Sequence, residues 1–384
     1  LGAVAVSRER GLGLLAPTLP AREAIGEHRV DDALLVPVGL RRARLEHGDL
    51  ERRRVPIGEG ALAGGPAGLG AVAPHRPVGG LDVEAVPHDA RLGWLIVHRE
   101  VQVVARRRPL HLDKLLARDD VEAVACDAPT TAHHDILIKA ARAGKHIFTE
   151  KALCPTVAEC EEVKKAIEEA GVTFVISYPQ RGRPSVLFAK EMIARGMFGK
   201  ITLVRMRDAH AGVSGNWLPD YWFEKKDAAG GAMMDLGCHP MYLLAYFLGK
   251  PKRVTGMFTA PYGKPVDENA VAIAEFDGGA LGVAETAFVS YNSPQTLEIY
   301  GTEGSMIAHG EDVQFSSAKL SGIKNGFMKP DLPQAKPAPI LQFVDACLNG
   351  TGSPEGLGID DAIALTELLE NAYIGDENAR IVEL

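Results

Sequence analysis

An aspartate and a histidine stand four residues apart in an apolar stretch, at Asp235 and His239. The stretch from about Met233 to Leu248 has the pattern of a helix. Residues at this spacing project from one helix face, so both side chains can meet one target. With an ordinary pKa of about 6.5, a histidine can take a hydroxyl proton near neutral pH. The pair indicates general base chemistry; the alternative is a core histidine that binds a backbone carbonyl. Pro240 predicts a bend directly after His239.

A second charged pair, Glu150 and Lys151, follows a short apolar strand at residues 146–148. Open α/β sheets bind their ligands at the carboxyl ends of parallel strands, where this pair stands. A fixed cation there can stabilise negative charge that develops on an oxygen atom. The alternative is a solvated salt bridge, and most of those contribute little to stability.

Pro129, Thr130 and His133 follow the preceding apolar strand and open a helix. At such a position backbone N–H groups and short polar side chains meet a bound dinucleotide. Thr130 or Thr131 would also serve as a helix N-cap, and the two roles can coexist. We found no Cys or His spacing typical of a metal site, so no metal is expected.

Strands and helices alternate between residues 110 and 177, as the apolar pattern shows. The pattern predicts helices at residues 112–116, 134–143 and 157–170, and strands at residues 121–126, 146–148 and 172–177. This alternation is typical of a parallel sheet with helices on both faces. The charged pair and the Pro129 loop then lie at the same edge of that sheet.

Strand follows strand after residue 200, which predicts an antiparallel sheet. The strands are expected at residues 201–207, 253–259, 270–276, 280–288, 295–300 and 306–309. Gly278-Gly279 marks a hairpin turn, and the alternation in residues 296–300 gives one apolar and one polar face. Two further helices, near residues 340–348 and 359–373, follow this region.

The composition is that of an ordinary globular protein, with 384 residues, 46% of them hydrophobic and 24% charged. The length suffices for two domains. A formal net charge of −8 gives no basic field for nucleic acid, and no apolar window is long enough to span a membrane. The five cysteines form no disulfide pattern, which favours a reducing, cytoplasmic compartment. Arg8, Glu9 and Arg10 interrupt the apolar opening, so we expect no secretory signal.

Residues 1–113 differ in composition from the rest of the chain. They contain 16 Arg but no Lys, Asn, Phe, Tyr or Met, and their net charge is +2, whereas residues 114–384 carry −10. Two interpretations stay open: an Arg-rich appended domain, or a GC-rich coding segment read in a wrong frame. Three GxGxxA strings occur here, beginning at Gly11, Gly58 and Gly68, but such strings arise by chance in Gly-rich and Ala-rich segments. The position of a glycine fingerprint is therefore left open.

Four local motifs occur in a familiar order. They are residues 128–133 (APTTAH), residues 143–151 (AGKHIFTEK), Gly230-Gly231 with Asp235 and His239, and residues 301–304 (GTEG). Together they resemble the Gfo/Idh/MocA family of NAD(P)-dependent oxidoreductases, over about residues 110–384. The resemblance implies a Rossmann-type doubly wound parallel sheet, with an atypical N-terminal part, followed by an α+β domain with a large, mostly antiparallel open sheet. The sheet of that second domain often forms the oligomer interface.

The family also implies roles for the residues singled out above. Lys151 lies beside nicotinamide and substrate, Asp235 binds the substrate and His239 is catalytic. Pro129, Thr130, His133 and Glu150, together with Lys151, contact NAD or NADP, between which the sequence does not choose. Ala152 stands where the family usually has Pro, and Ala128 and Thr130 replace the outer residues of its Thr-Pro-Asn motif. Tyr242 stands where many members have a further Asp, so the substrate class stays open.

We therefore expect an oxidoreductase that transfers a hydride between NAD(P) and a hydroxyl or carbonyl of a sugar, polyol or inositol-like substrate. Two alternatives are an NAD-dependent glycoside hydrolase of the same fold and an inactive sugar-binding or oligomerising relative. Residues 1–150 are the expected nucleotide-binding domain and residues 151–384 the substrate and oligomerisation domain. A homo-oligomer, dimer or tetramer, is expected. The aromatic segment 216–223 lines a sugar pocket or forms a lid or interface loop, and Tyr178 is similarly undecided.

Overall fold

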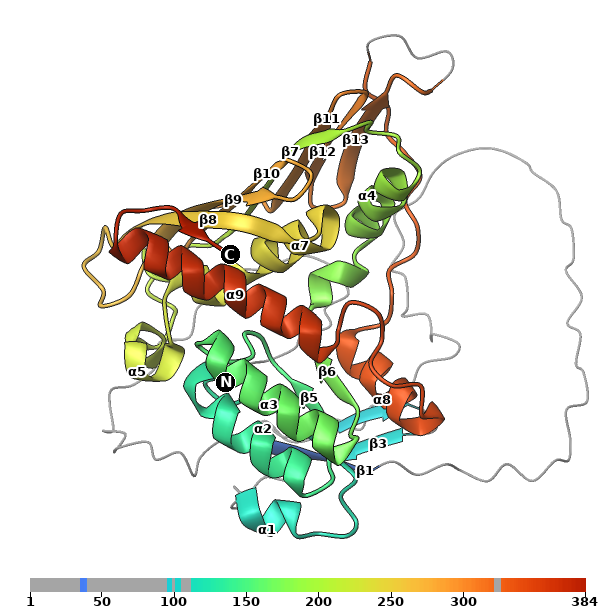
Figure 1. The fold of residues 1–384 in the computed structure, drawn as a ribbon, viewed down its shortest axis with the longest axis vertical. Coiled ribbons are helices and arrows are strands. Elements are labelled where there is room, and N and C mark those ends of the chain that lie inside the picture. The colour runs from blue at the N-terminus through green and yellow to red at the C-terminus, as the bar shows by residue number, and fades with distance from the viewer. Residues whose placement is uncertain (1–34, 40–94, 99–100, 105–111, 321–325) are drawn as a thin grey trace, which may run out of the picture.

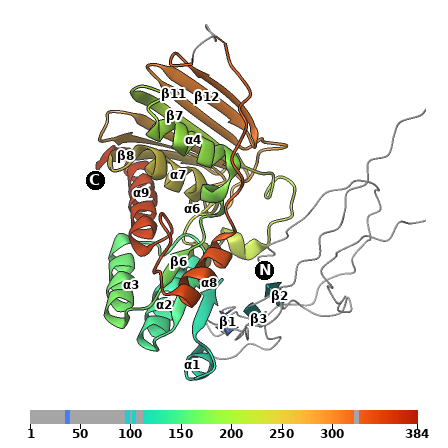
Figure 2. The ribbon, with the colours of Figure 1, turned by 90° about the vertical axis from the view of Figure 1, so that its right-hand side faces the viewer.

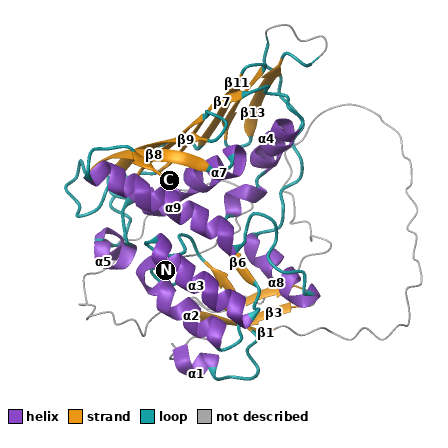
Figure 3. Ribbon diagram, in the orientation of Figure 1, coloured by secondary structure: helices purple, strands orange, loops and turns teal. Residues whose placement is uncertain are grey.

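The computed structural model describes residues 35–39, 95–98, 101–104, 112–320 and 326–384. Two β-sheets, joined by helices, make up this part of the chain (Figure 1). Figure 3 distinguishes the strands of both sheets from the helices around them. The three GxGxxA strings lie outside the described residues.

The first sheet carries the strands that lead into the predicted site. Its order is β2 (Leu95–His98), β3 (Val101–Val104), β1 (Leu35–Gly39), β4 (Ala123–Cys126), β5 (His146–Thr149) and β6 (Phe174–Ile176). The strands β4, β5 and β6 run parallel, as the sequence predicted. The strand β1 is antiparallel to both of its neighbours, β3 and β4.

Four helices accompany the parallel strands, two of them in contact with these strands and two packed on other helices. They are α1 (Leu112–Leu116), α2 (His133–Arg142), α3 (Val157–Ala170) and, from the far end of the chain, α8 (Pro339–Asn349). The helix α3 begins at a capping box of Thr156 and Glu159 and ends at Gly171, whose φ of 63° suits glycine. Contacts join α2 to β4 and β5, and α8 to β5 and β6.

The second sheet has eight strands and is antiparallel except for one pair. Its order is β13 (Asp312–Ser317), β12 (Gly304–His309), β11 (Thr296–Gly301), β7 (Ile201–Ala209), β10 (Leu281–Ala287), β9 (Asn269–Phe276), β8 (Pro251–Thr259) and β14 (Val382–Glu383). The central pair β7 and β10 is parallel. The hairpin predicted at Gly278-Gly279 joins the antiparallel strands β9 and β10.

Helices cover one face of this sheet. They are α4 (Pro184–Ala194), α6 (Ala232–Asp235), α7 (Cys238–Leu248) and α9 (Ile359–Glu377), and Figure 2 shows them on a single side of the strands. The predicted alternation in β11 is confirmed, because Leu297 and Ile299 are buried while Thr296, Glu298 and Tyr300 are only partly buried. The core of the second unit therefore lies between the sheet and these helices.

The single helix predicted over residues 233–248 is wrong, because the chain breaks at Leu236 and Gly237 between α6 and α7. A Cβ on Gly237 would lie 2.7 Å from the carbonyl oxygen of Met233, so only glycine allows this close approach. The bend predicted at Pro240 is also wrong. Pro240 stands in the first turn of α7, where its missing N–H would have no helical partner.

Several elements were not predicted from the sequence. They are α4, α5 (Lys225–Ala228), β13, β14 and the 3₁₀ turns η2 (Thr130–Ala132), η3 (Pro179–Gly182) and η4 (Asp220–Phe223). The sheets also do not divide at residue 150, since β6 joins the first sheet and α8 packs on it. None of the helices in the described residues is long and apolar enough to cross a membrane.

Candidate active site

Lys151 and Asp235, 84 positions apart in the sequence, meet in the fold. The Lys151 ammonium lies 2.8 Å from Asp235 Oδ1 and 2.6 Å from the Asp235 carbonyl oxygen. Lys151 is the second residue after β5, its peptide bond to Ala152 is cis, and Asp235 is the last residue of α6. Only 14% of the lysine side chain and 19% of the aspartate side chain are exposed. The pair therefore joins the first sheet to the second unit at a partly water-accessible position.

The charges around Lys151 keep it protonated. Burial alone would lower the pKa of its ammonium, but the charge of Asp235 and the hydrogen bond to it outweigh this effect, with a smaller contribution from Glu150, and the pKa is raised. Lys151 is consequently a fixed cation and does not act as a base near neutral pH. This property fits the role expected from the sequence, which is to stabilise negative charge on a substrate oxygen.

His239 stands at the start of α7, with its Nδ1 3.1 Å from the hydroxyl oxygen of Tyr242. Burial, and secondarily the positive charge of Lys151, hold the pKa of His239 well below its usual range. The imidazole is therefore neutral near pH 7 and can accept a proton. Asp235 and His239 belong to two helices instead of one helix face, yet both lie within the electrostatic reach of Lys151.

Glu150 lies beside Lys151 and is largely buried. Burial raises the pKa of its carboxyl group, while the charge of Lys151 and a hydrogen bond from Ser177 oppose that rise. Pro129 is exposed and Thr130 is half-buried, and both follow the carboxyl end of β4. Neither threonine is an N-cap: no side-chain cap bond forms at η2 or α2, and Thr131 instead donates to the carbonyl oxygen of Lys226 at 3.0 Å.

His133 occupies a different place from the one expected of a cofactor contact. Its ring is buried, with 1% exposure. Nε2 lies 2.9 Å from the carbonyl oxygen of Ala128, and Nδ1 lies 3.0 Å from those of Ala152 and Leu153. The ring thus ties the loop after β4 to the turn after Lys151, and both of its nitrogens are engaged by the backbone.

Two polar residues at the end of β7 were missed by the sequence reasoning. The Asp208 carboxylate accepts hydrogen bonds from Gln180 at 2.7 Å and from Gln295 at 2.9 Å; burial raises its pKa, and the charge of Lys151 opposes this. Burial lowers the pKa of His210, and the charge of Asp235 opposes this. Both residues therefore lie near the Lys151 pair. The signal was available, because polar residues that end an alternating strand often line a site.

The aromatic segment 216–223 is compatible with both predicted interpretations, a sugar-pocket lining and a lid or interface loop. Trp217 is 57% exposed, and its ring lies 4.6 Å from the ring of His210. Tyr178 is fully buried and stacks on Tyr242, with ring centroids 4.1 Å apart. Tyr178 therefore belongs to the packing beneath the site and does not line its surface.

Asp267, also missed from the sequence, fixes the glycine pair that leads into α6. Its carboxylate accepts the N–H of Gly231 at 2.8 Å, the N–H of Met233 at 2.7 Å and the hydroxyl of Tyr373 at 2.7 Å. A side chain on Gly231 would overlap the Asp267 backbone. These contacts explain why residue 231 is a glycine. They also fix the orientation of α6, which ends at Asp235.

A half-buried, neutral histidine thus lies within the electrostatic reach of a lysine–carboxylate ion pair, and the lysine of that pair stands at the carboxyl edge of the parallel strands. Open parallel sheets bind nucleotides at this edge, and a neutral histidine near a fixed cation is an arrangement that can take up a proton and stabilise a negatively charged oxygen.

Comparisons with known proteins specify the family. Residues 94–178 match the model of the oxidoreductase family with an NAD-binding Rossmann fold, and residues 186–307 match the GFO/IDH/MocA C-terminal domain. The chain belongs to the Gfo/Idh/MocA family of oxidoreductases, which confirms the resemblance and the fold class predicted from the sequence.

The relatives include enzymes named for sugars and inositols. A 1,5-anhydro-D-fructose reductase from Ensifer adhaerens is 26% identical over 261 residues, which cover 66% of this chain and 77% of that protein. A scyllo-inositol 2-dehydrogenase (NAD(+)) from Bacillus subtilis is 31% identical over 204 residues, covering 50% and 56%. The structure of GenD2 from gentamicin A biosynthesis in complex with NAD has a TM-score of 0.60 at 28% identity, covering 71% and 81%. The chain thus spans between about half and three quarters of the length of these two curated relatives.

Proposed function

We propose that this chain is an NAD(P)-dependent dehydrogenase that acts on a secondary hydroxyl group, or the corresponding carbonyl, of a sugar, polyol or inositol-like substrate. The observation that carries the proposal is the contact between Lys151 and Asp235 beside a neutral His239. The sugar and inositol relatives support the substrate class.

Three residues of the chain have separate roles in the proposed reaction. In the oxidative direction, His239 takes the hydroxyl proton while the Lys151 cation stabilises the alkoxide character of the oxygen. Asp235 keeps Lys151 charged and can bind a neighbouring substrate hydroxyl. The reverse direction uses the same groups, with the proton returned to the carbonyl oxygen.

The nicotinamide cofactor, when bound, supplies the hydride acceptor or donor. The described residues fit it, because Pro129, Thr130 and Glu150 stand at the carboxyl ends of β4 and β5, the edge at which open parallel sheets bind nucleotides. These residues, with Lys151, would hold the cofactor. We propose that residues before and around β5 serve the cofactor and that the larger second unit serves the substrate.

The experiment is an assay of the purified chain with NAD and with NADP against anhydrosugars, aldoses and inositols. We expect stoichiometric NAD(P)H with at least one cyclic polyol. Release of sugar from a nitrophenyl glycoside without net NADH would select the glycoside hydrolase alternative instead. An absence of turnover with bound sugar would select the inactive relative.

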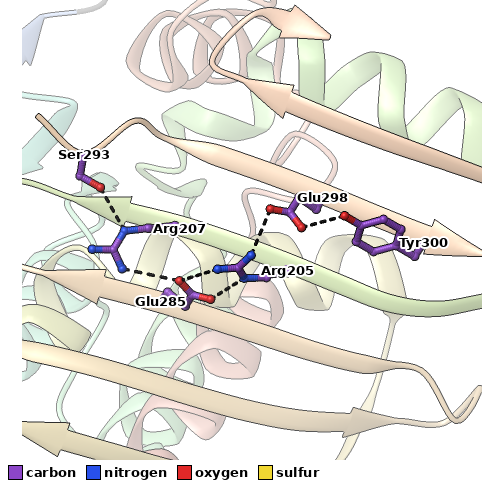
Figure 4. A network of polar contacts seen from close by, with 6 residues as sticks. All are labelled: Arg205, Arg207, Glu285, Ser293, Glu298 and Tyr300. Carbon is purple, nitrogen blue, oxygen red and sulfur yellow. Dashed lines mark hydrogen bonds and ion pairs between the residues drawn. The ribbon is translucent and has the colours of Figure 1, made fainter. Parts of the chain in front are cut away.

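We further propose that the chain acts in the cytoplasm and assembles through the open face of its second sheet. That face carries a network in which Arg205 pairs with Glu285 at 2.5 Å and with Glu298 at 3.2 Å, and Arg207 lies 3.6 Å from Glu285 (Figure 4). The strand register places apolar side chains on the same face, with Ile273 opposite Val283 and Val283 opposite Arg205.

Met257, Ile273 and Leu281 on this face are 75%, 44% and 44% exposed. An apolar sheet surface with an internally balanced set of charges suits a second copy of the same chain, because docking leaves no arginine or glutamate without a partner. The proposed assembly is a homo-oligomer built from this contact.

A further inference from the structure

Tyr242 makes a direct contact with the proposed catalytic histidine. It lies one helical turn after His239 in α7, and its hydroxyl oxygen is 3.1 Å from His239 Nδ1. The same oxygen accepts the backbone N–H of Gln180 from η3 at 3.2 Å. The side chain is almost completely buried, at 1% exposure. The hydroxyl therefore has no bulk water to exchange with, and its two protein partners determine its role.

The ring that carries this hydroxyl is held firmly. It stacks on Tyr178 with centroids 4.1 Å apart and an interplanar angle of 22°. The Arg181 guanidinium lies 5.3 Å from the Tyr178 ring and 5.9 Å from the Tyr242 ring. Arg181 is itself bound to Asp361 at 3.0 Å and to the Gly356 carbonyl oxygen. Three segments of the chain thus fix the position of the Tyr242 hydroxyl.

The contact decides which nitrogen of His239 is available for chemistry. Nδ1 is engaged by Tyr242, which leaves Nε2 for a substrate hydroxyl. A neutral imidazole carries its proton on one nitrogen and its electron pair on the other, so Nε2 can accept a proton only if Nδ1–H donates to the tyrosine oxygen. A phenolic oxygen has two lone pairs, so it can accept both the Gln180 N–H and the His239 Nδ1–H when its own O–H proton is turned away from Nδ1; the opposite direction, with the O–H donating to Nδ1, would place the imidazole proton on Nε2.

We propose that Tyr242 is the positioning residue of His239: its oxygen accepts the Nδ1–H and so keeps the Nε2 electron pair directed at the substrate hydroxyl. This inference rests on the proposed dehydrogenase function. In the oxidative step the substrate O–H bond breaks and an N–H bond forms at Nε2. The hydride leaves the same carbon with its electron pair for the nicotinamide ring, so a carbonyl is formed and the charges balance.

The charged and titratable groups around the two residues are consistent with this arrangement. Lys151, at the end of β5, is the charge that acts on His239. Arg181 from η3, Tyr178 before it and Cys238 from α7 act on Tyr242, whose pKa is raised well above its usual range, chiefly by burial. Tyr242 therefore stays a neutral phenol and does not become a second base.

The test compares two matched variants, Tyr242→Phe and Tyr178→Phe. Each removes one hydroxyl from the same stacked, buried pair, but the Tyr178 hydroxyl donates to the Asp361 carbonyl oxygen at 3.3 Å instead of meeting His239. We expect Tyr242→Phe to lower kcat roughly 10-fold or more, as the loss of a hydrogen bond to a group that becomes charged implies. KM for sugar and cofactor should stay within about twofold, and Tyr178→Phe should change neither constant beyond about twofold. Equal kcat values in the two variants would overturn the proposal.

A second measurement does not depend on turnover. Nitrogen-15 NMR of the full chain labelled at histidine reports which His239 nitrogen carries the proton, with His239→Ala assigning the signal. We expect Nδ1–H in the parent and a mixture of tautomers in Tyr242→Phe. A parent with Nε2–H would overturn the proposal even if Tyr242→Phe did not fold. If no sugar is turned over but Nδ1–H is observed, the dehydrogenase function fails while the positioning contact stands.

Discussion

The Lys151–Asp235 ion pair has two functions in the proposed site: it connects the first sheet to α6, and it keeps a cation near the end of β5. Both side chains are mostly buried, so each charge needs the other. A buried ion pair contributes little net stability compared with apolar packing, but removing one partner leaves a charge without compensation. The pair is therefore better explained by the need for a cation at the carboxyl end of β5 than by stability.

A double-mutant cycle tests this view of the pair. Lys151→Met and Asp235→Asn should each lower the free energy of unfolding by about 1–3 kcal/mol, because each leaves a partly buried polar group without its partner. The double variant should lose less than the sum, with a coupling energy of about 1 kcal/mol or more. Denaturant unfolding provides the measurement. Additive losses would show that the two charges do not interact in solution.

The pH dependence of catalysis follows from the environment of His239. Since burial and Lys151 lower its pKa, the imidazole stays unprotonated to more acidic pH than a free histidine. Oxidation needs the unprotonated form, so kcat/KM should fall as the pH drops, with the acid limb centred below about pH 6.5. A pH–rate profile with the preferred sugar measures this limb. A limb centred at or above pH 6.5 would contradict the partly desolvated, cation-flanked environment of His239.

Individual residues differ in how far the sequence could assign them. Lys151, Asp235 and His239 were predicted as site residues because the order of motifs is specific; in the structure Lys151 contacts Asp235 and its charge acts on His239, while their catalytic roles stay a prediction. His133 belongs to one of the same motifs, yet its ring is bound by three carbonyl oxygens. A sequence pattern records that a polar residue is needed but not whether it faces a ligand or the backbone. Asp208 belongs to no motif, and its place after the strand predicted at residues 201–207 was its only signal, because its partners Gln180 and Gln295 are distant in the sequence.

At the scale of elements, the break between α6 and α7 controls the direction of the site residues. The sequence reasoning joined residues 233–248 into one helix, because the apolar pattern is continuous across Leu236 and Gly237. The break depends on contacts with residues far along the chain, above all the Asp267 carboxylate at the start of α6. Helices with local signals were predicted closely: α3, with its capping box and Gly171, has the expected bounds.

The glycine before α6 gives a test at this scale. Gly231→Ala should lower the free energy of unfolding by about 1–3 kcal/mol, since the added methyl group overlaps the Asp267 backbone. Gly278→Ala is the matched control, because a Cβ at that hairpin position meets nothing within 4 Å, and its effect should stay within about 0.5 kcal/mol. Thermal and denaturant unfolding measure both. Equal stability of the two variants would show that Asp267 does not anchor α6.

At the scale of the whole molecule, the order of strands and helices predicted two sheets of different kinds, and both are present. The antiparallel pairing of β1 was not predicted, and neither was the return of α8 to the first sheet. Such contacts join segments that share no local pattern, so periodicity gives no signal for them. The glycine fingerprint and the unusual composition of residues 1–113 concern mainly residues outside the described ranges.

The exposed apolar residues on the open face of the second sheet lead us to predict that the chain forms a homo-oligomer. The parent chain should sediment as a dimer or a larger homo-oligomer. A variant carrying Met257→Glu and Ile273→Glu should sediment as a monomer, because two buried carboxylates without partners oppose association. Analytical ultracentrifugation with circular dichroism as a folding control provides the measurement. The control Glu377→Gln, on an exposed side chain of α9, should leave the assembly unchanged. A monomeric parent chain would contradict the proposal that this face forms an interface between two copies of the chain.

His239 is the residue that we propose to transfer the proton when a sugar hydroxyl is oxidised. The most direct measurement is kcat for NAD(P)H formation by the parent, by His239→Ala and by His309→Ala, whose exposed histidine in β12 is the matched control. The proposed role predicts a loss of about 10²- to 10⁴-fold in kcat for His239→Ala and parent values for His309→Ala. A His239→Ala variant that folds, binds sugar and cofactor and keeps kcat within a few-fold of the parent would contradict it.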